Sequence, residues 1–181
     1  MRRTRALILL ILAFVAAIVT TTAQATPKAE ASDNAPVTMS DALFWTIIDG
    51  TTADEAEPEA QLGALREILT GLSMEEVVAF HDAFERQMQR AYTWDLWAVA
   101  YIAHGGASDD GFDYFRRWLI SKGRAVFEQV VAQPDSLAEV LAADSEGVLE
   151  FEEISAVATE VWARKSGRTQ DEMPMTPALR R

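Results

Sequence analysis

The chain has 181 residues, which is enough for one domain of ordinary size with some length to spare at its ends. Its formal net charge is −12. Such an acidic protein repels nucleic-acid phosphates and anionic lipid surfaces, which argues against either as a partner. The absence of cysteine excludes disulfides, thiolate metal sites and cysteine nucleophiles.

Residues 1–25 show the order of features that is typical of a secretory signal. Three arginines within the first five residues precede an apolar run, ALILLILAFVAAIV, and an A-x-A sequence follows at 23–25. We expect cleavage after Ala25 and a secreted or periplasmic protein, in keeping with the absence of cysteine. The alternative is a single N-terminal membrane anchor, because adding 20–23 would bring the apolar run close to the length of a bilayer span. Cleavage would leave 13 basic and 28 acidic residues, a net charge of −15.

The rest of the chain is divided by composition. Residues 26–38 mix proline, alanine, serine and charged residues without a period, which predicts a flexible linker. A helical domain is expected over 39–167. Residues 168–181 contain two prolines and no period, so we expect a loose C-terminal tail.

Capping residues and apolar periodicity predict the helices of the first half. Ser40 caps a short helix that stops at Asp49-Gly50, and an acidic loop separates it from a second helix that ends at Gly71. The sequence Ser73-Met74-Glu75-Glu76 is a capping box and begins a third helix. We expect its buried stripe to run through Val77, Phe80, Phe84, Met88 and Tyr92.

Further helices are predicted in the second half. One runs from Trp94 to His104, and Ser108 caps the next, which ends at Lys122-Gly123. Others cover 124–131 and 151–165, and Asp135 or Ser136 is expected to cap a short segment around Leu137 and Leu141. Because no segment alternates strictly and no repeat is evident, the predicted fold is all-α, a compact single-domain bundle of about six to seven short helices.

A long and specific pattern occupies residues 92–123, YTWDLWAVAYIAHGGASDDGFDYFRRWLISKG. It resembles the core of a bacterial family known as domain of unknown function 4240. The matching positions are Trp94, Asp95, Trp97, Ala100, Tyr101, Gly106, Ser108, Asp109, Asp110, Phe112, Phe115, Arg116, Trp118, Leu119 and Gly123. Met39, Phe44-Trp45 and Ile48-Asp49 are similar to the family's first helix, and 134–137 to a later turn. The resemblance covers about 39–143 and implies a compact helical fold, without an established activity.

Two departures from the family pattern bear on the cellular compartment of the protein. Members often carry a cysteine where this chain has Ala107, and most lack an export signal. Both departures fit a protein that has moved outside the cytoplasm, and both separate it from any cytoplasmic partner of its relatives.

Polar residues concentrate around the Gly105-Gly106 loop. The weak catalytic candidates are Asp95, His104, Ser108, Asp109, Asp110 and Arg116. A metal or acid–base interpretation takes His104 with Asp109 and Asp113. The structural interpretation, which we favour, makes Ser108 a cap, places the aspartates at the positive helix end, pairs Asp113 with Arg116 or Arg117, and lets Arg116 tie the loop down.

Asp95 lies between two tryptophans. We expect it to be a buried acceptor for an indole N–H or for Arg116, with a general acid as the alternative. The chain has only two histidines and none of the common hydrolase, P-loop or zinc-protease motifs, so we expect no metal and no cofactor.

Most tryptophans and phenylalanines are expected in the core. The candidates for binding are Trp94, Trp97, Tyr101 and Trp118, which would form a surface for a partner helix or peptide if they were exposed. The favoured hypothesis is a non-enzymatic protein-binding or regulatory module outside the cytoplasm, for a protein partner such as a basic toxin. The alternative is an enzyme or metal-dependent site around His104, Ser108, Asp109 and Arg116. No membrane contact is expected of the mature domain unless the leader is kept as an anchor.

Overall fold

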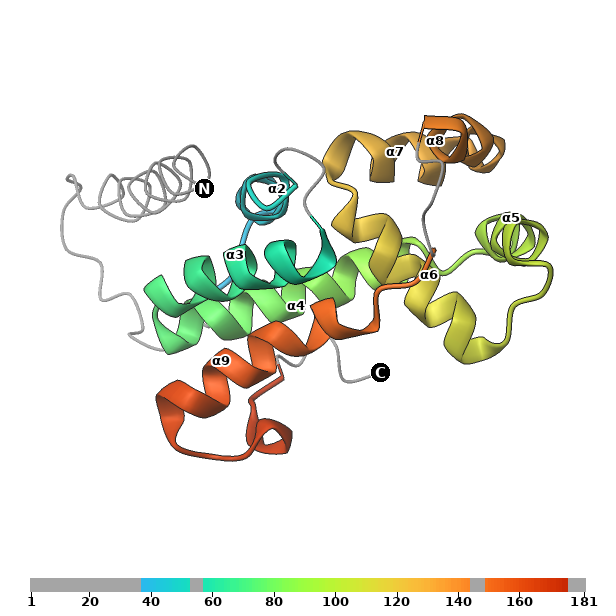
Figure 1. Ribbon diagram of the computed structural model, residues 1–181. Coiled ribbons are helices and arrows are strands. Elements are labelled where there is room, and N and C mark those ends of the chain that lie inside the picture. The colour runs from blue at the N-terminus through green and yellow to red at the C-terminus, as the bar shows by residue number, and fades with distance from the viewer. Residues whose placement is uncertain (1–36, 53–56, 144–148, 176–181) are drawn as a thin grey trace, which may run out of the picture.

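The computed structural model describes residues 37–52, 57–143 and 149–175 (Figure 1). The predicted leader and nearly all of the predicted linker lie outside these ranges. Within them the chain forms eight α-helices, three 3-10 turns and no strand, so the predicted all-α fold is confirmed. The α-helices are α2 (Asp41–Asp49), α3 (Pro58–Gly71), α4 (Met74–Arg90), α5 (Trp94–His104), α6 (Asp109–Ser121), α7 (Arg124–Ala132), α8 (Leu137–Ala143) and α9 (Ala156–Ser166). None of the helices in the described ranges is long and apolar enough to cross a membrane.

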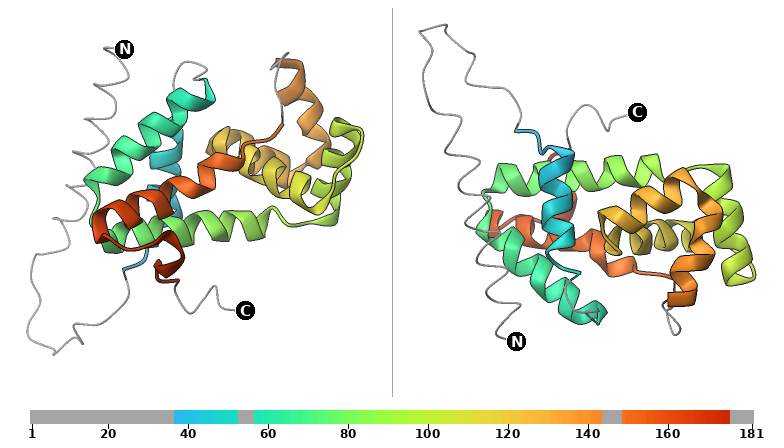
Figure 2. Two further views of the ribbon diagram at one scale, coloured as in Figure 1. Left: turned by 60° about the horizontal axis from the view of Figure 1, so that its bottom comes forward. Right: turned by 90° about the horizontal axis from the view of Figure 1, so that it is seen from above.

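Helix α4 is the longest helix of the described ranges and connects two groups of helices (Figure 2). In one group α2 and α9 pack on α4, and α3 packs on both α2 and α9. In the other group α6 packs on α4, and α5 and α7 pack on α6. Helix α5 therefore lies at one end of the molecule, where Figure 1 shows it almost along its axis.

Aromatic side chains fill the core between α2 and α4. The ring of Phe44 lies 5.3 Å from that of Phe80 and 6.3 Å from that of Phe84, and Trp45 contacts Phe127 of α7 at 4.9 Å. Edge-to-face and tilted arrangements at these separations are the favourable ones for aromatic pairs. The predicted stripe of α4 is buried, except for its last member: α4 ends at Arg90, and Tyr92 is 60% exposed.

Local capping fixes the starts of four helices, as predicted for Ser40, Ser108 and the capping box at Ser73; the cap at Thr93 was not predicted. Ser40, Thr93 and Ser108 each accept a hydrogen bond from the backbone N–H three residues later, and both bonds of the Ser73–Glu76 capping box are present. The prediction for Ser136 was wrong. A 3-10 turn, Pro134–Ser136, runs directly into α8, and the Ser136 hydroxyl has no hydrogen-bond partner among the described residues.

The start of α7 is capped from a distant part of the chain. Gly123 precedes α7 with φ +88° and ψ 172°, and its neighbour Arg124 donates its backbone N–H to Asp49 Oδ1 at 2.7 Å. A Cβ on Gly123 would lie 2.7 Å from the same oxygen. A carboxylate at the end of α2 thus replaces the local side-chain cap that α7 lacks.

Candidate functional site

Helix α5 lies at one end of the described structure and has its own cap at each terminus. Thr93 Oγ1 accepts the Leu96 N–H at 3.2 Å to start it, and Gly105 ends it in the left-handed conformation with φ +70°. Along the helix only Leu96 and Ala100 are buried. The helix is therefore held by a narrow inner strip and leaves a wide face open.

The open face of α5 is apolar. Trp94 is 82% exposed, Ile102 78% and Tyr101 56%, and Ala98 between them is exposed as well. Positions i, i+4, i+7 and i+8 lie on one side of an α-helix, so these four residues form a continuous strip, which we call the α5 face. Soluble proteins seldom leave large apolar side chains clustered in this way without a function.

Stacked rings hold the most exposed member of the α5 face in place. The Trp94 ring stacks on Trp97 at 5.7 Å, and Trp97 stacks on Phe112 of α6 at 4.7 Å. The Trp97 indole N–H also donates to the carbonyl oxygen of Ala107 at 3.4 Å. Trp94 is thus a fixed aromatic side chain on the surface, which is the kind of residue that dominates binding energy at protein interfaces.

The four predicted binding residues separate into two groups. Trp94 and Tyr101 belong to the α5 face, and Trp97 supports it as a half-buried ring. Trp118 is only 4% exposed and stacks on Phe115 inside the domain, so it is part of the core. Sequence reasoning missed Ile102 and Ala98, although the apolar residues on all sides of 94–104 would have indicated that some of them must face outward.

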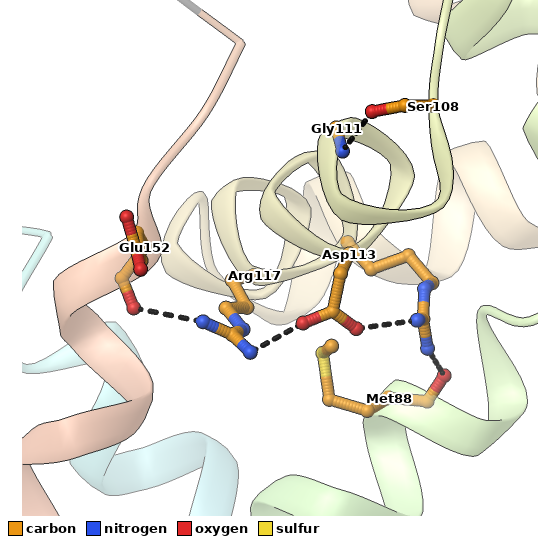
Figure 3. A network of polar contacts seen from close by, with 7 residues as sticks. Met88, Ser108, Gly111, Asp113, Arg117 and Glu152 are labelled. Atoms are coloured by element: carbon orange, nitrogen blue, oxygen red, sulfur yellow. Dashed lines mark hydrogen bonds and ion pairs between the residues drawn. The ribbon is translucent and has the colours of Figure 1, made fainter.

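A network of charged side chains ties α6 to its neighbours (Figure 3). Asp113 accepts hydrogen bonds from Arg116, at 2.6 Å, and from Arg117. Arg116 also donates to the carbonyl oxygen of Met88 at 2.8 Å, and Arg117 to that of Glu152 at 3.1 Å. Arg116 therefore joins α6 to the end of α4, and not to the Gly105-Gly106 loop as predicted.

The environment of Arg116 is that of a structural side chain. It is only 8% exposed, and its guanidinium lies 4.9 Å from the ring centre of Tyr92 and 5.0 Å from that of Phe112. Burial lowers the pKa of this guanidinium, and the Asp113 carboxylate acts in the opposite direction. Two hydrogen-bonding partners and two aromatic faces offset the desolvation of the charge.

The comparisons with known proteins give one match. The model of a protein family described as "Protein of unknown function (DUF4240)" matches residues 39–164. The chain belongs to this family. No curated protein and no solved structure matches it. The DUF4240 match extends beyond the predicted resemblance and includes most of α9.

The side chains predicted as catalytic candidates in this DUF4240 domain each contact a different group. Ser108 Oγ accepts the Gly111 N–H at 3.1 Å, as a cap does. His104 Nδ1 lies 3.5 Å from Glu150 Oε1, and its ring meets the ring of Phe115 edge-on. Asp109 and Asp110 are exposed in the first turn of α6.

Asp95 is exposed on α5, so the prediction of a buried acceptor was wrong. The position beside two tryptophans suggested burial, but Trp94 itself faces outward and Asp95 follows it. The acceptors of Arg116 are the Met88 carbonyl and the Asp113 carboxylate instead.

A polar hollow of about 380 Å³ lies between α4 and α6. Its lining consists of Glu85, Met88, Gln89, Tyr92, Asp113, Arg116 and Arg117. Of the catalytic candidates it contains Arg116 alone, and the two arginines in it are already paired with Asp113. No group of three or more histidine, aspartate or glutamate side chains in the described ranges is arranged to hold a metal ion.

Proposed function

We propose that this protein is an exported, non-enzymatic binding module that recognises another protein through the α5 face. The observation that carries the proposal is the exposure of Trp94, Tyr101 and Ile102 together on one side of one helix. An interface that covered them would remove most of the exposed apolar surface of this end of the domain from water. Full burial of each side chain stabilises a complex by about 1.5 to 3 kcal/mol before the costs of association.

The rigidity of the α5 face supports a role in binding. Thr93 and Gly105 cap the helix, and the Trp94–Trp97–Phe112 stack orients its largest side chain. A surface that is ordered before the partner arrives loses less conformational entropy on association. Tryptophan and tyrosine are also the residues in which interface hot spots are enriched.

Features of the sequence support export. The arginines, the apolar run and the A-x-A sequence within residues 1–25 are the features that a signal peptidase reads, and no cysteine is present that an oxidising compartment would affect. We therefore propose that the protein is cleaved after Ala25 and acts in the periplasm or outside the cell.

The experiment is site-specific photo-crosslinking in the cells that produce the protein. A benzophenone amino acid replaces Ile102 in one variant and Met74 in the control; Met74 is also exposed, at 40%, but lies at the start of α4 in the other group of helices. We expect a protein adduct of defined mass from position 102 and none from position 74, in the periplasmic or culture fraction. N-terminal sequencing of the same material is expected to begin at Thr26. Equal adducts from both positions, or none from either, would contradict the proposed binding surface.

A further inference from the structure

A carboxylate, Asp95, borders the α5 face on one side. With 3.6 residues per turn, Asp95 is rotated by about 100° from Trp94 on α5, next to the strip that Ala98 and Ile102 continue. Asp95 is exposed, and no ion pair engages it among the described residues. This edge of the α5 face therefore carries an uncompensated negative charge.

Two further carboxylates lie at the start of α6, which follows the loop that Trp97 contacts. Trp97 flanks Trp94 on the side away from Asp95, and its indole N–H donates to the carbonyl oxygen of Ala107, just before α6. Asp109 and Asp110 begin α6 two and three residues later, both exposed and without an ion pair in the described part of the chain. Asp109 thus begins α6 two residues after the carbonyl that Trp97 binds, whereas Asp110 lies on the opposite side of α6 from Phe112, near Tyr114.

No lysine or arginine lies in the same stretch of sequence as these carboxylates. Residues 91–115 contain four aspartates and no lysine or arginine. The nearest arginine that follows, Arg116, is buried and paired with the fourth of them, Asp113. The α5 face is consequently an apolar strip with a carboxylate, Asp95, along one edge, on a chain with a net charge of −12.

We infer that the partner is a basic amphipathic helix of another protein, with an apolar stripe bordered by lysine or arginine. This inference rests on the proposed function and narrows it to one class of partner. The strip from Trp94 to Ile102 is about 12 Å long, two turns of helix, and matches the apolar i, i+3, i+4 and i+7 positions of a helix packed against it. Asp95 and the net negative charge of the chain attract a basic partner and raise its association rate. They repel a second copy of this acidic chain and an anionic lipid surface.

The test measures the binding of two labelled helical peptides to the purified mature protein by fluorescence anisotropy. The peptides share one leucine pattern, at i, i+3, i+4 and i+7, with lysine at the other positions in one peptide and glutamate in the other. The variants are Ile102→Ser and Asp95→Lys, and Met74→Ser is the matched control at an exposed apolar residue away from the α5 face. Because Ile102 is 78% exposed, its substitution is expected to leave the melting temperature unchanged.

We expect the lysine peptide to bind and the glutamate peptide not to bind. Ile102→Ser is expected to weaken the lysine peptide by about tenfold or more, since it removes an apolar side chain from the interface. Asp95→Lys is expected to weaken it by about twofold to fivefold, with a shallower dependence on salt, and Met74→Ser to have no effect.

Several outcomes would overturn the inference. Equal binding of both peptides would show that negative charge near the α5 face does not select the partner. If Ile102→Ser leaves the binding of the lysine peptide unchanged, the peptide does not bind at the α5 face. If the free protein associates with itself and Ile102→Ser abolishes this association, the occupant of the α5 face is a second copy of the chain. If the protein binds phosphatidylcholine vesicles and this binding depends on Ile102, the occupant is a membrane. If neither peptide binds while position 102 still gives a protein adduct in cells, the inferred class of partner is wrong and the proposed function stands.

Discussion

The contact between α2 and α7 allows one stability prediction to be worked through in numbers. Gly123 has φ +88° and ψ 172°, a region that is essentially restricted to glycine, so Gly123→Ala incurs about 1 to 3 kcal/mol of backbone strain. The added Cβ would also lie 2.7 Å from Asp49 Oδ1. That oxygen caps Arg124, and displacing it loses about 1 kcal/mol more. We expect Gly123→Ala to lower the free energy of unfolding by about 2 to 4 kcal/mol in total.

A double-mutant cycle separates the two contributions. Asp49→Ala alone is expected to cost about 1 kcal/mol through the lost cap, and in that background Gly123→Ala retains only its strain. The double variant should therefore be about 1 kcal/mol more stable than the sum of the single effects predicts. Gly167→Ala is the control: Gly167 also has a positive φ, +70°, but a Cβ there would meet nothing within 4 Å, so no coupling to Asp49 is expected.

The assay is urea unfolding of the purified proteins, followed by circular dichroism at constant pH and salt. Additive effects of Asp49→Ala and Gly123→Ala would refute the clash with the cap. A cost for Gly123→Ala no greater than that for Gly167→Ala would refute the whole account of this junction.

Three further predictions concern stability. Ser73→Ala should lower the unfolding free energy by about 1 kcal/mol in urea, because it removes the acceptor of the capping box at the start of α4. Arg116→Met should cost about 2 to 3 kcal/mol and Arg117→Met about 1 kcal/mol or less in the same assay, since only Arg116 is buried; equal costs would argue against the assigned roles. A hydrogen bond from Arg90 holds the pKa of Glu128 below its ordinary value. The Glu128 carboxylate therefore stabilises the fold at any pH above the ordinary pKa, and this stabilisation is lost as the pH falls through the lowered pKa of the folded state. Glu128→Gln should therefore cost about 0.5 kcal/mol or less at pH 7, as expected for a partly exposed pair, and progressively less as the pH is lowered through the acidic range, in paired thermal melts.

The helices of this domain were predictable because residues close in the sequence determine where many of them begin. The hydroxyls of Ser40, Ser73, Thr93 and Ser108 accept from N–H groups three residues away, and such contacts depend little on the rest of the fold. Tyr92 shows the limit of this reasoning. Its spacing from Met88 continues the apolar stripe, but α4 ends at Arg90, and beyond that point the helical period no longer determines which way a side chain points.

The contacts between helices were not predictable from local patterns. The cap of α7 comes from Asp49, and the carbonyl acceptor of Arg116 comes from Met88; both bring together residues that are far apart in the sequence. The candidate site depended on the same information. Trp94 could be named as a binding residue from the sequence, but only the packing of Leu96 and Ala100 against the domain decides that Trp94 faces outward.

The caps and ring contacts of α5 explain how so apolar a helix can lie exposed at the surface. Helices that are apolar on all sides are normally buried, and an unsupported one would tend to lose its structure in water. Here Thr93 and Gly105 satisfy backbone groups at both ends, and the Trp97 ring packs α5 onto Phe112 of α6. These contacts support α5 within the domain, while its outer strip leaves Trp94, Tyr101 and Ile102 exposed. A binding surface built in this way can stay folded when it is free and still retain a large gain in apolar burial for the complex.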